Sequence, residues 1–473
     1  MSALPLNRRH FLGASAASAF AQAPKGDHRS VLVLIGDDHS PVAGCYGNPI
    51  ISTPNLDRLA KQGVRFSRSY CTTASCSASR SVVLTGLHNH ANGQFGHAHA
   101  PHNFHTHEWV HSIPRLATAQ GFATGVVGKL HVLPPSVYPW DYESPGGPQG
   151  GPRDVYGVAQ KVAEFLKTIG SRPFYLHVGF TDPHRGAGPG GFANNRNYPN
   201  VKKTVYSPAD VIVPPFLPDS PEVRKELAEY YQATTRLDQG IGFVLEALHN
   251  SGRAKDTLII YLGDNGLPFP GAKASFYDSG LACPIVISSP DIQKRGLTCS
   301  ALVHFPDILP TAIQWMGIPG PSYPLHGRSL LPILEEESPA GRDEIFFSHT
   351  FHEINNYYPM RGIRTRRYKY IRFLYPELEM PMPSDLFDSP TWQSIRRGNL
   401  PMMGLRKTAA VLRHRHEELY DLEKDPWETT DLSISPSHAG ILKELRAKVQ
   451  QFRQDTKDPW WIVDQQRGET GQT

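Results

Sequence analysis

Residues 75–86, with the sequence SCSASRSVVLTG, carry the clearest chemical potential in the chain. Ser75 is a suitable helix N-cap, which places Cys76 in the first helical turn, where backbone N–H groups favour a neighbouring anion. Arg80 follows four residues later and therefore shares a helix face with Cys76. A nucleophilic side chain, a helix N-terminus and a fixed cation together suit a tetrahedral oxyanion such as sulfate or phosphate. The alternative for this stretch taken alone is a buried cysteine with a surface arginine.

Polar residues follow four apolar runs that have the character of buried strands. Residues 31–36 precede Asp37 and Asp38, residues 122–128 precede Lys129 and His131, residues 172–180 precede Asp182 and His184, and residues 257–262 precede Asp264 and Asn265. Active sites of parallel α/β sheets lie beyond the carboxyl ends of the strands, so we expect these groups at one edge. The adjacent carboxylates Asp37 and Asp38 favour a bound cation, although a solvated turn is the alternative.

The elements between these runs predict an α/β sheet followed by a smaller domain. Amphipathic helices are expected near residues 55–62, 155–169 and 227–248, and strands that alternate with helices indicate an α/β fold. After about residue 340, residues 364–373 alternate like one antiparallel strand, residues 418–426 resemble a strand and turn, and residues 441–452 form an amphipathic helix. We therefore divide the mature chain into a catalytic domain, 24–345, and a smaller α+β domain, 346–473.

The first 23 residues have the pattern of a twin-arginine-type signal peptide. Arg8 and Arg9 precede a short apolar run at 13–20, and Ala19, Ala21 and Ala23 offer cleavage sites. The run is too short to span a bilayer, and no later apolar stretch reaches that length. The pattern predicts an exported protein, periplasmic or secreted, without a membrane partner; a chance Arg-Arg pair is the alternative.

The composition excludes several other classes of protein. The net charge of +4 is small and the chain has no lysine or arginine run, which argues against nucleic-acid binding. The five cysteines include no C-x-x-C pair, so a structural zinc site is not expected. Besides Cys76 they are Cys45, Cys71, Cys283 and Cys299, whose scatter does not resemble a disulfide framework, although their pairing stays open.

A loop from 88 to 111 is rich in histidine. It includes His90, His97, His99, His102, His105 and His107. Their irregular spacing argues against a second metal site and favours a polar lining of the substrate pocket, with a plain surface loop as the alternative. We therefore take His90 as a candidate substrate-binding residue.

The motif C-S-A-S-R with a downstream L-T-G resembles the signature of type I, formylglycine-dependent sulfatases. The resemblance extends over nearly the whole mature chain, through residues 37–38, 53–57, 128–131, 263–266 and 418–426. Within that family the chain is similar to the N-sulfoglucosamine sulfohydrolases, or sulfamidases, in segments 182–185, 264–270, 326–332, 352–353 and 358–361. The resemblance implies an alkaline phosphatase-like fold: a large, mostly parallel sheet flanked by helices, and a C-terminal α+β domain with an antiparallel sheet.

The resemblance also implies a nucleophile and a metal. Cys76 would be oxidised to formylglycine, whose hydrate attacks sulfur. One Ca²⁺ would be held by Asp37, Asp38, Asp264, Asn265 and the modified Cys76. Oxygen ligands of this kind favour Ca²⁺ or Mg²⁺ over zinc.

Further roles follow from the same resemblance. Arg80 and Lys129 would hold the formylglycine hydroxyls and the sulfate, and His131 would accept the proton that lets the sulfate leave. His184 and Lys273 would bind sulfate, with His184 as donor to the leaving group. The expected substrate contacts are His352, Glu353 and Arg361, although Arg361 could instead form a salt bridge between domains.

Two positions depart from the family pattern. Ala78 stands where proline is usual. Lys273 stands where sulfamidases usually carry arginine, so the charge is kept but bidentate contact with an oxyanion is lost.

The sequence therefore predicts a calcium-dependent sulfatase that hydrolyses the N-sulfate of glucosamine in heparan sulfate or heparin-type glycans. The alternatives are an O-sulfatase acting on a related sugar, a phosphoesterase, and a non-catalytic glycan-binding homologue with unmodified Cys76. The phosphoesterase is disfavoured because no second set of metal ligands can be assembled. A formylglycine-generating enzyme is an expected partner during maturation, and a homodimer is possible.

Overall fold

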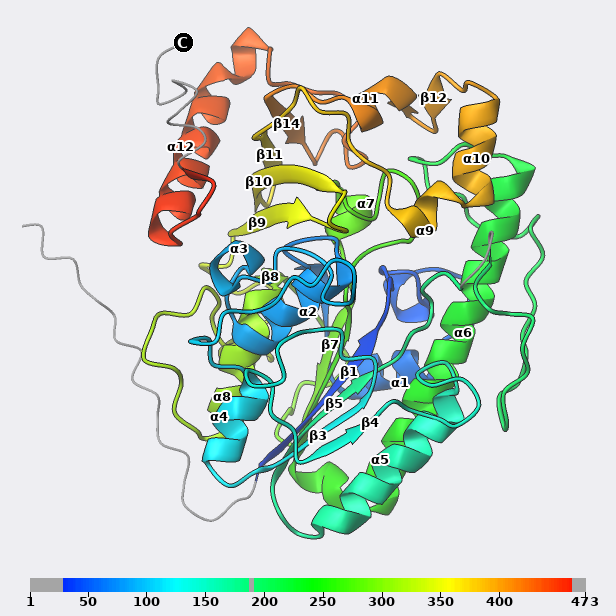
Figure 1. Cartoon of the computed structure of the whole chain (residues 1–473), viewed down its shortest axis with the longest axis vertical. Helices are drawn as coiled ribbons and strands as arrows, with labels where there is room; N and C mark the ends of the chain where they lie inside the picture. Colours follow the sequence, from blue (N-terminus) through cyan, green and yellow to red (C-terminus); the bar gives the residue numbers. More distant parts are fainter. Residues whose placement is uncertain (1–28, 187–190, 462–473) are drawn as a thin grey trace, which may run out of the picture.

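The computed structural model describes residues 29–186 and 191–461 of the 473-residue chain. The expected signal peptide, residues 1–23, lies outside the described residues. Figure 1 shows two sheets, with the smaller one (yellow to orange) stacked beyond one end of the larger one.

The large sheet has eight strands in the order β4-β3-β5-β1-β6-β7-β2-β8. Its strands are β1 Ser30–Gly36, β2 Val64–Tyr70, β3 Ala123–Gly128, β4 Tyr142–Ser144, β5 Phe174–Gly179, β6 Thr257–Gly263, β7 Ile285–Ser288 and β8 Leu297–His304. Only β7 runs antiparallel to its neighbours within this sheet. The expected mostly parallel sheet is confirmed, and all four apolar runs are strands in it.

Helices cover both faces of the large sheet because the central strands are apolar on both sides. On one face Leu32 and Leu34 of β1 pack with α1, α5 and α6, and on the other Val31 and Val33 pack with α2, α4 and α8. The helices are α1 Pro54–Gln62, α2 Cys76–Thr85, α3 Asn89–Asn92, α4 Ile113–Ala119, α5 Val155–Ile169, α6 Pro221–Asn250, α7 Asp278–Leu281 and α8 Ile308–Met316. This arrangement buries β1 completely and leaves its carboxyl end to carry polar groups.

The small sheet is antiparallel, in the order β14-β11-β10-β9. Its strands are β9 Glu344–Phe351, β10 Tyr357–Thr365, β11 Tyr368–Phe373 and β14 Glu417–Asp421, and β12 Met402–Met403 with β13 Arg406–Lys407 forms a separate ribbon. The remaining helices are α9 Ser384–Phe387, α10 Pro390–Arg397, α11 Thr408–Leu412 and α12 Ala439–Asp455. The expected C-terminal antiparallel sheet is confirmed.

One strand prediction in this region is only partly correct. Residues 364–373 contain the end of β10, a turn at 366–367 and the whole of the antiparallel strand β11, instead of one continuous strand. Thr365 closes the turn, because its Oγ1 accepts a hydrogen bond of 2.8 Å from the Tyr368 backbone N–H. Arg366 and Arg367 at the turn are neither glycine nor proline, so the alternating pattern continued without a visible break.

The two sheets share one hydrophobic core. Phe347 of β9 and Met360 of β10 belong to the same buried cluster as Val33 of β1 and Ile313 of α8. The C-terminal region is therefore packed onto the large sheet, and the division at residue 345 stays a proposal about sequence organisation.

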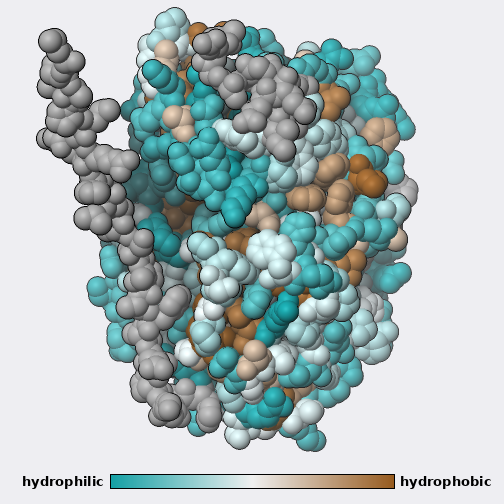
Figure 2. Space-filling model, turned by 60° about the vertical axis from the view of Figure 1, so that its left-hand side comes forward, coloured by the Kyte–Doolittle hydropathy of each residue, from teal (hydrophilic) through white to brown (hydrophobic). Residues whose placement is uncertain are grey.

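The surface and the cysteines carry two further observations. Figure 2 shows apolar side chains on one face as separate patches among hydrophilic ones. Within the described ranges 29–186 and 191–461, no helix has both the length and the apolar character that crossing a bilayer requires. All five cysteines lie in these ranges, and each is a free thiol.

Candidate active site

The register of the large sheet brings its polar strand ends together. Gly36 of β1 lies opposite Gly263 of β6, and Gly179 of β5 lies opposite Gly128 of β3. Because these strands end level with one another, the residues that follow them meet at one edge. A side chain at Gly179 would not fit, since its Cβ would lie 1.9 Å from the Lys129 carbonyl oxygen. The glycine lets the Lys129 backbone approach the sheet closely.

Three carboxylates from two adjacent strands form the centre of this edge. Asp37, Asp38 and Asp264 are fully buried and, with Cys76, each place one ligand atom within 4.8 Å of the others. The Asp38 backbone N–H donates to Asp264 Oδ1 at 2.8 Å. Asn265 donates through Nδ2 to Asp38 Oδ1 at 2.7 Å, which leaves its own Oδ1 without a partner. Asp37 Oδ1 is also buried without a hydrogen bond, and Arg80 Nη2 lies 3.7 Å from it.

Charge in this cluster is unevenly balanced. Burial alone would raise the pKa of Asp37, but the nearby Lys129, His184 and Arg80 outweigh it and hold that pKa well below the usual value. Burial and the charge of Asp37 raise the pKa of Asp264 to about 7. The packed carboxylates therefore repel one another and favour an additional cation among them.

The residues present fit a hard divalent cation. The possible ligand atoms are carboxylate and amide oxygens, two of them buried without a hydrogen bond, and this is the ligand chemistry of Ca²⁺. Asp37, Asp38, Asp264 and Asn265 are brought together as the sequence predicted, and Cys76 lies beside them with Sγ 3.9 Å from Asp38 Oδ1.

Cys76 is the first residue of α2, which is buried along its whole length. Ser75 is the N-cap in extended conformation, but its side chain makes no capping bond; its Oγ instead hydrogen bonds with His352 Nδ1 at 3.0 Å. The first-turn N–H groups beside Cys76 are thus not occupied by the cap side chain. Burial raises the pKa of the Cys76 thiol well above its ordinary value, so the side chain is a thiol and a poor nucleophile as it stands.

The two positively charged residues that the sequence places near Cys76 are Arg80 and Lys129. Arg80, one turn along α2, donates through Nε to Asp264 Oδ2 at 2.8 Å and through Nη1 to the Lys129 carbonyl at 2.9 Å. Lys129 forms an ion pair with Asp37. Arg80 Nη2 lies 3.7 Å from Asp37 Oδ1 but makes no hydrogen bond, so this nitrogen can still donate one to a bound oxyanion.

A second pair of groups approaches from the opposite side. Lys273 donates to Asp38 Oδ2 at 3.0 Å and to Asp385 Oδ2 at 2.7 Å. His184 Nε2 lies 3.8 Å from Asp38 Oδ2 and 3.6 Å from Asp385 Oδ2. Its Nδ1 donates to the Arg185 carbonyl at 2.7 Å, so Nε2 faces the cluster. The structure brings both predicted residues to the site.

Asp385 was missed by the sequence analysis. It lies on the short helix α9 in the C-terminal region, more than a hundred residues from Lys273, and no motif surrounds it. Burial would raise the pKa of Asp385, but Lys273 and His184 outweigh it and hold that carboxyl ionised. The C-terminal region thus supplies a charged group to the site.

His131 and His352 line the same site above Cys76. His131 has a left-handed backbone conformation with φ of 63°, which turns the chain sharply after Lys129. Burial, followed by the charge of Lys129, holds the pKa of His131 well below 6.5, so its ring is neutral and can accept a proton. Glu353 accepts hydrogen bonds from Ser384 and so anchors α9; substrate contacts by His352 and Glu353 stay predictions.

Two of the predicted substrate-binding residues are buried and have protein partners. His90 is buried, and its ring nitrogens hydrogen bond with Ser348 Oγ at 2.6 Å and Thr456 Oγ1 at 2.8 Å. Arg361 is fully buried and pairs in bidentate fashion with Asp458 at 2.8 and 2.9 Å. Of the two roles considered for Arg361, the structure supports the salt bridge, although both partners lie in the C-terminal region.

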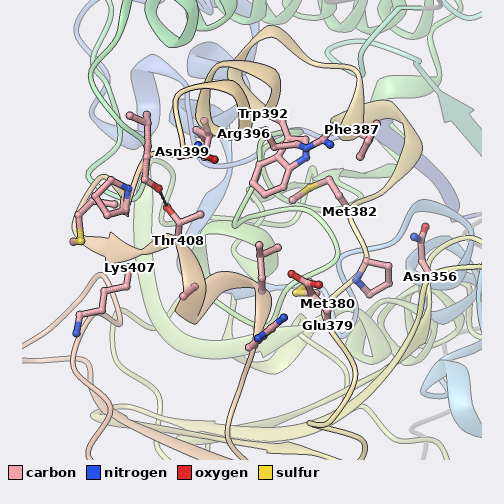
Figure 3. Close-up of a pocket in the computed structure, with 18 of the residues that line it drawn as sticks. Asn356, Glu379, Met380, Met382, Phe387, Trp392, Arg396, Asn399, Lys407 and Thr408 are labelled. Atoms are coloured by element: carbon pink, nitrogen blue, oxygen red, sulfur yellow. Dashed lines mark hydrogen bonds between the residues drawn. The ribbon is translucent and has the colours of Figure 1, made fainter.

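A cavity of ~1180 Å³ lies beside the site. Figure 3 shows it between Trp392, Phe387 and Met382 on one side and Lys407 and Thr408 on another. Phe387 and the site residue Asp385 share helix α9, so one short helix forms a wall of both spaces. None of the carboxylates around Cys76 lines this cavity.

Comparison with known proteins identifies the family. The sulfatase family model matches residues 29–318, and the model described as N-sulphoglucosamine sulphohydrolase, C-terminal, matches residues 272–391. The N-sulphoglucosamine sulphohydrolase of Homo sapiens is 36% identical over 471 residues, which cover 91% of each chain. An ulvan-active sulfatase of Formosa agariphila is 30% identical and covers 88% of this chain and 78% of its own.

Solved structures share the fold. One that was determined in complex with its substrate D-glucosamine-2-N,6-O-disulfate matches 91% of this chain and 99% of its own, with a TM-score of 0.66 and 20% identity. The family match and the human relative together show that this chain is a member of the sulfatase family and a hydrolase of sulfate esters or sulfamates.

Proposed function

We propose that this protein is a calcium-dependent, formylglycine sulfatase that hydrolyses the N-sulfate of glucosamine in heparan sulfate or heparin-type glycans. The observation that carries the proposal is the meeting of Cys76, three buried carboxylates and the unbonded amide oxygen of Asn265 at one edge of the sheet. The 36% identity to a sulphohydrolase acting on N-sulphoglucosamine supports the choice of substrate.

In this proposal Asp37, Asp38, Asp264 and Asn265 hold the calcium ion. Bound there, Ca²⁺ would offset the negative charge of the sulfate and polarise its oxygens. Arg80 contributes from the side of α2 through the free Nη2, and Lys129 holds Asp37 in place through its ion pair. Lys273 balances the charge of Asp38 and Asp385 on the other side.

Oxidation of Cys76 to formylglycine would supply an aldehyde hydrate with one hydroxyl to attack sulfur and a second to release sulfate. The buried, protonated thiol accords with a precursor of this kind better than with a thiolate nucleophile. The N-terminus of α2 and Arg80 are positioned to stabilise negative charge that develops beside residue 76.

Two histidines have the positions needed for proton transfer. The neutral ring of His131 suits a proton acceptor near residue 76. His184 presents Nε2 to the site while its Nδ1 donates to the Arg185 carbonyl, so in the protonated ring the proton for the departing glucosamine nitrogen would leave from Nε2.

The substrate preference is tested by a paired sugar assay. Glucosamine that carries only an N-sulfate and N-acetylglucosamine that carries only a 6-O-sulfate are each incubated with the calcium-loaded, mature enzyme, and released sulfate is measured. We expect release from the N-sulfated sugar. Release from the O-sulfated sugar alone would favour the O-sulfatase alternative. The similarity to an ulvan-active sulfatase is the reason to test this alternative.

The cofactors have separate tests. Thorough chelation should abolish turnover, and added Ca²⁺ should restore it; full activity after chelation would contradict the ligand assignment. Mass spectrometry of the Cys76 peptide, from protein made with a formylglycine-generating enzyme, should show the aldehyde. An intact thiol under those conditions would favour a glycan-binding homologue and would implicate Ala78 in blocking conversion.

Export and assembly remain part of the proposal. The twin-arginine pattern at Arg8 and Arg9 predicts a periplasmic or secreted enzyme. A homodimer is expected from the resemblance to sulfamidases, and its mass in solution can be measured directly.

A further inference from the structure

A group of histidines lies beside the carboxylate cluster, on the loop that the sequence analysis interpreted as a pocket lining. His97, His99 and His131 each place one ring nitrogen within 4.8 Å of the other two. Their ring centroids are 5.1, 5.1 and 4.9 Å apart, so the three rings surround a common point. The irregular spacing had argued against a metal here, but His131 arrives from the end of β3 rather than from the loop.

His97 has the strongest sign of a missing partner. It is only 7% exposed, and neither of its ring nitrogens has a hydrogen-bond partner. His131 Nδ1 is also buried and unpaired. Buried polar atoms are normally hydrogen bonded, so orphan nitrogens that face other imidazoles indicate a ligand that binds nitrogen.

The backbone holds His97 firmly in place. Its N–H donates to the His352 carbonyl at 2.9 Å, and its carbonyl accepts from the Phe104 N–H at 3.1 Å. The next residue is fixed to α2, because the Ala98 N–H donates to Ser77 Oγ at 3.0 Å. The loop therefore presents the ring of His97 from a fixed position rather than as a mobile surface side chain.

We propose that His97, His99 and His131 form a second metal site, which binds a borderline transition-metal ion such as Zn²⁺. Three imidazoles are a common ligand set for zinc, whereas Ca²⁺ requires oxygen ligands. The two neighbouring sites would therefore select different metals.

The protonation state and the geometry support this assignment. Burial lowers the pKa of all three rings, so they are in the neutral form that binds metals. His99 Nδ1 and His131 Nε2 hydrogen bond with each other at 2.7 Å, and a bound metal ion would replace this bond, since two ligands of one tetrahedral zinc ion lie about 3.3 Å apart. The difference between these two separations is small, and the His99 side chain is exposed.

Occupation of this site would inhibit turnover. This consequence rests on the proposed function, because the metal would take the nitrogen lone pair with which His131 is proposed to accept a proton. The binding itself is independent of that role. A transition-metal ion would thus switch off the enzyme without displacing the calcium ion.

The test measures Zn²⁺ binding to the calcium-loaded full chain by titration calorimetry, with Co²⁺ as a spectroscopic substitute for Zn²⁺. We expect one equivalent of Zn²⁺ to bind in excess Ca²⁺, and Co²⁺ to show the visible absorption of an imidazole-bound ion. The variant His99→Ala should bind Zn²⁺ at least about tenfold more weakly. Because His99 is exposed, this variant should fold normally, which its thermal unfolding will verify.

His105→Ala is the matched control, since His105 is an exposed histidine of the same loop outside this group. It should bind Zn²⁺ like the unaltered protein. Absence of Zn²⁺ binding in excess Ca²⁺ would overturn the proposal. Unchanged affinity in His99→Ala would also overturn it, and a loss in His102→Ala instead would move the site to the neighbouring group of His97, His102 and Glu353. These outcomes do not depend on turnover, so they are separate from the tests of the proposed function.

Discussion

Two buried clusters of charged side chains in this molecule have similar composition but differ in whether all their polar atoms are hydrogen bonded. At the strand edge Asp37, Asp264 and Arg80 are fully buried, yet Asp37 Oδ1 and Arg80 Nη2 have no hydrogen-bond partner. Beneath α12, Arg361 and Asp458 are also buried, but Asp458 receives two bonds from Arg361 and one from Arg453.

The difference separates a site from a structural ion pair. Every side-chain nitrogen of Arg361 donates a hydrogen bond, two of them to Asp458 and one to the His349 carbonyl. Such a cluster has no capacity left for a ligand. Near Cys76, by contrast, Asp37 Oδ1, Asn265 Oδ1 and Arg80 Nη2 are buried without a hydrogen bond, and an added cation and oxyanion would satisfy these atoms.

The largest expected effect comes from Cys76. Replacing it with alanine should remove the proposed nucleophile and reduce kcat by on the order of 10⁶-fold, with little change in thermal unfolding. Sulfate release from N-sulfoglucosamine measures the loss. Cys71→Ala is the matched control, because Cys71 is a second buried free cysteine outside the carboxylate cluster and should retain kcat. Residual turnover in Cys76→Ala near that of the control would disprove the assignment.

Arg361→Ala tests the structural cluster. It leaves Asp458 buried without its bidentate partner, so we expect a loss of about 3–5 kcal/mol in the free energy of unfolding, measured with denaturant. Turnover per folded molecule should be unchanged. Asp458→Asn removes the other partner and should also destabilise the protein. A raised KM with an unchanged free energy of unfolding in Arg361→Ala would instead support the predicted contact between Arg361 and the substrate.

Lys129→Ala tests the active cluster in the same way. Asp37 loses its ion pair and the site loses a positive charge, so kcat should fall by about 10²–10³. Steady-state sulfate release gives the value. Lys161→Ala, which removes an exposed lysine paired with Glu164, should leave kcat unchanged. Destabilisation without a fall in kcat would show that Lys129 is structural, like Arg361.

The smallest effect concerns pH and His349, whose carbonyl belongs to the Arg361 cluster. Burial, with a smaller contribution from Arg361, lowers the pKa of His349 from 6.5 to about 3. Between these values only the unfolded chain binds the proton. The contribution of His349 to the free energy of unfolding is therefore complete above pH 6.5. It declines by about 1.4 kcal/mol per pH unit as the pH falls toward 3.

Denaturant unfolding between pH 7.5 and pH 5 measures this decline. His349→Gln keeps a group able to hydrogen bond with Thr73 but cannot take up the proton, so its stability should fall less steeply with pH. Other buried histidines, such as His39, contribute to the slope in both proteins, and only the difference is diagnostic. Equal slopes would contradict the assignment.

Much of the site could be predicted because its signals are local. Each of the four strands is an apolar run of a few residues, and the polar groups follow it directly in the chain. The parallel sheet then aligns these ends without further information. The start of α2 at Cys76 was also visible, since the N-cap and the Cys76–Arg80 spacing lie within one turn.

The failures share a different cause. His90 was chosen from the histidine-rich loop and Arg361 from a segment that resembles sulfamidases, but neither pattern shows whether a side chain faces the pocket or the core. Asp385 could not be found because nothing near it in the chain marks its contact with Lys273. The hairpin at Arg366 was missed because its turn has neither glycine nor proline.

The sequence by itself determined the four strands that carry the site, the nucleophile candidate and the oxygen-rich ligand set, because these depend on neighbours along the chain. The tertiary structure decided which buried charged groups have hydrogen-bond and ion-pair partners. It paired Arg361 with Asp458, brought Asp385 from α9 to Lys273, and gathered His97, His99 and His131 around one point. Satisfaction of a buried charge depends on atoms that approach from distant segments, and only the folded chain specifies them.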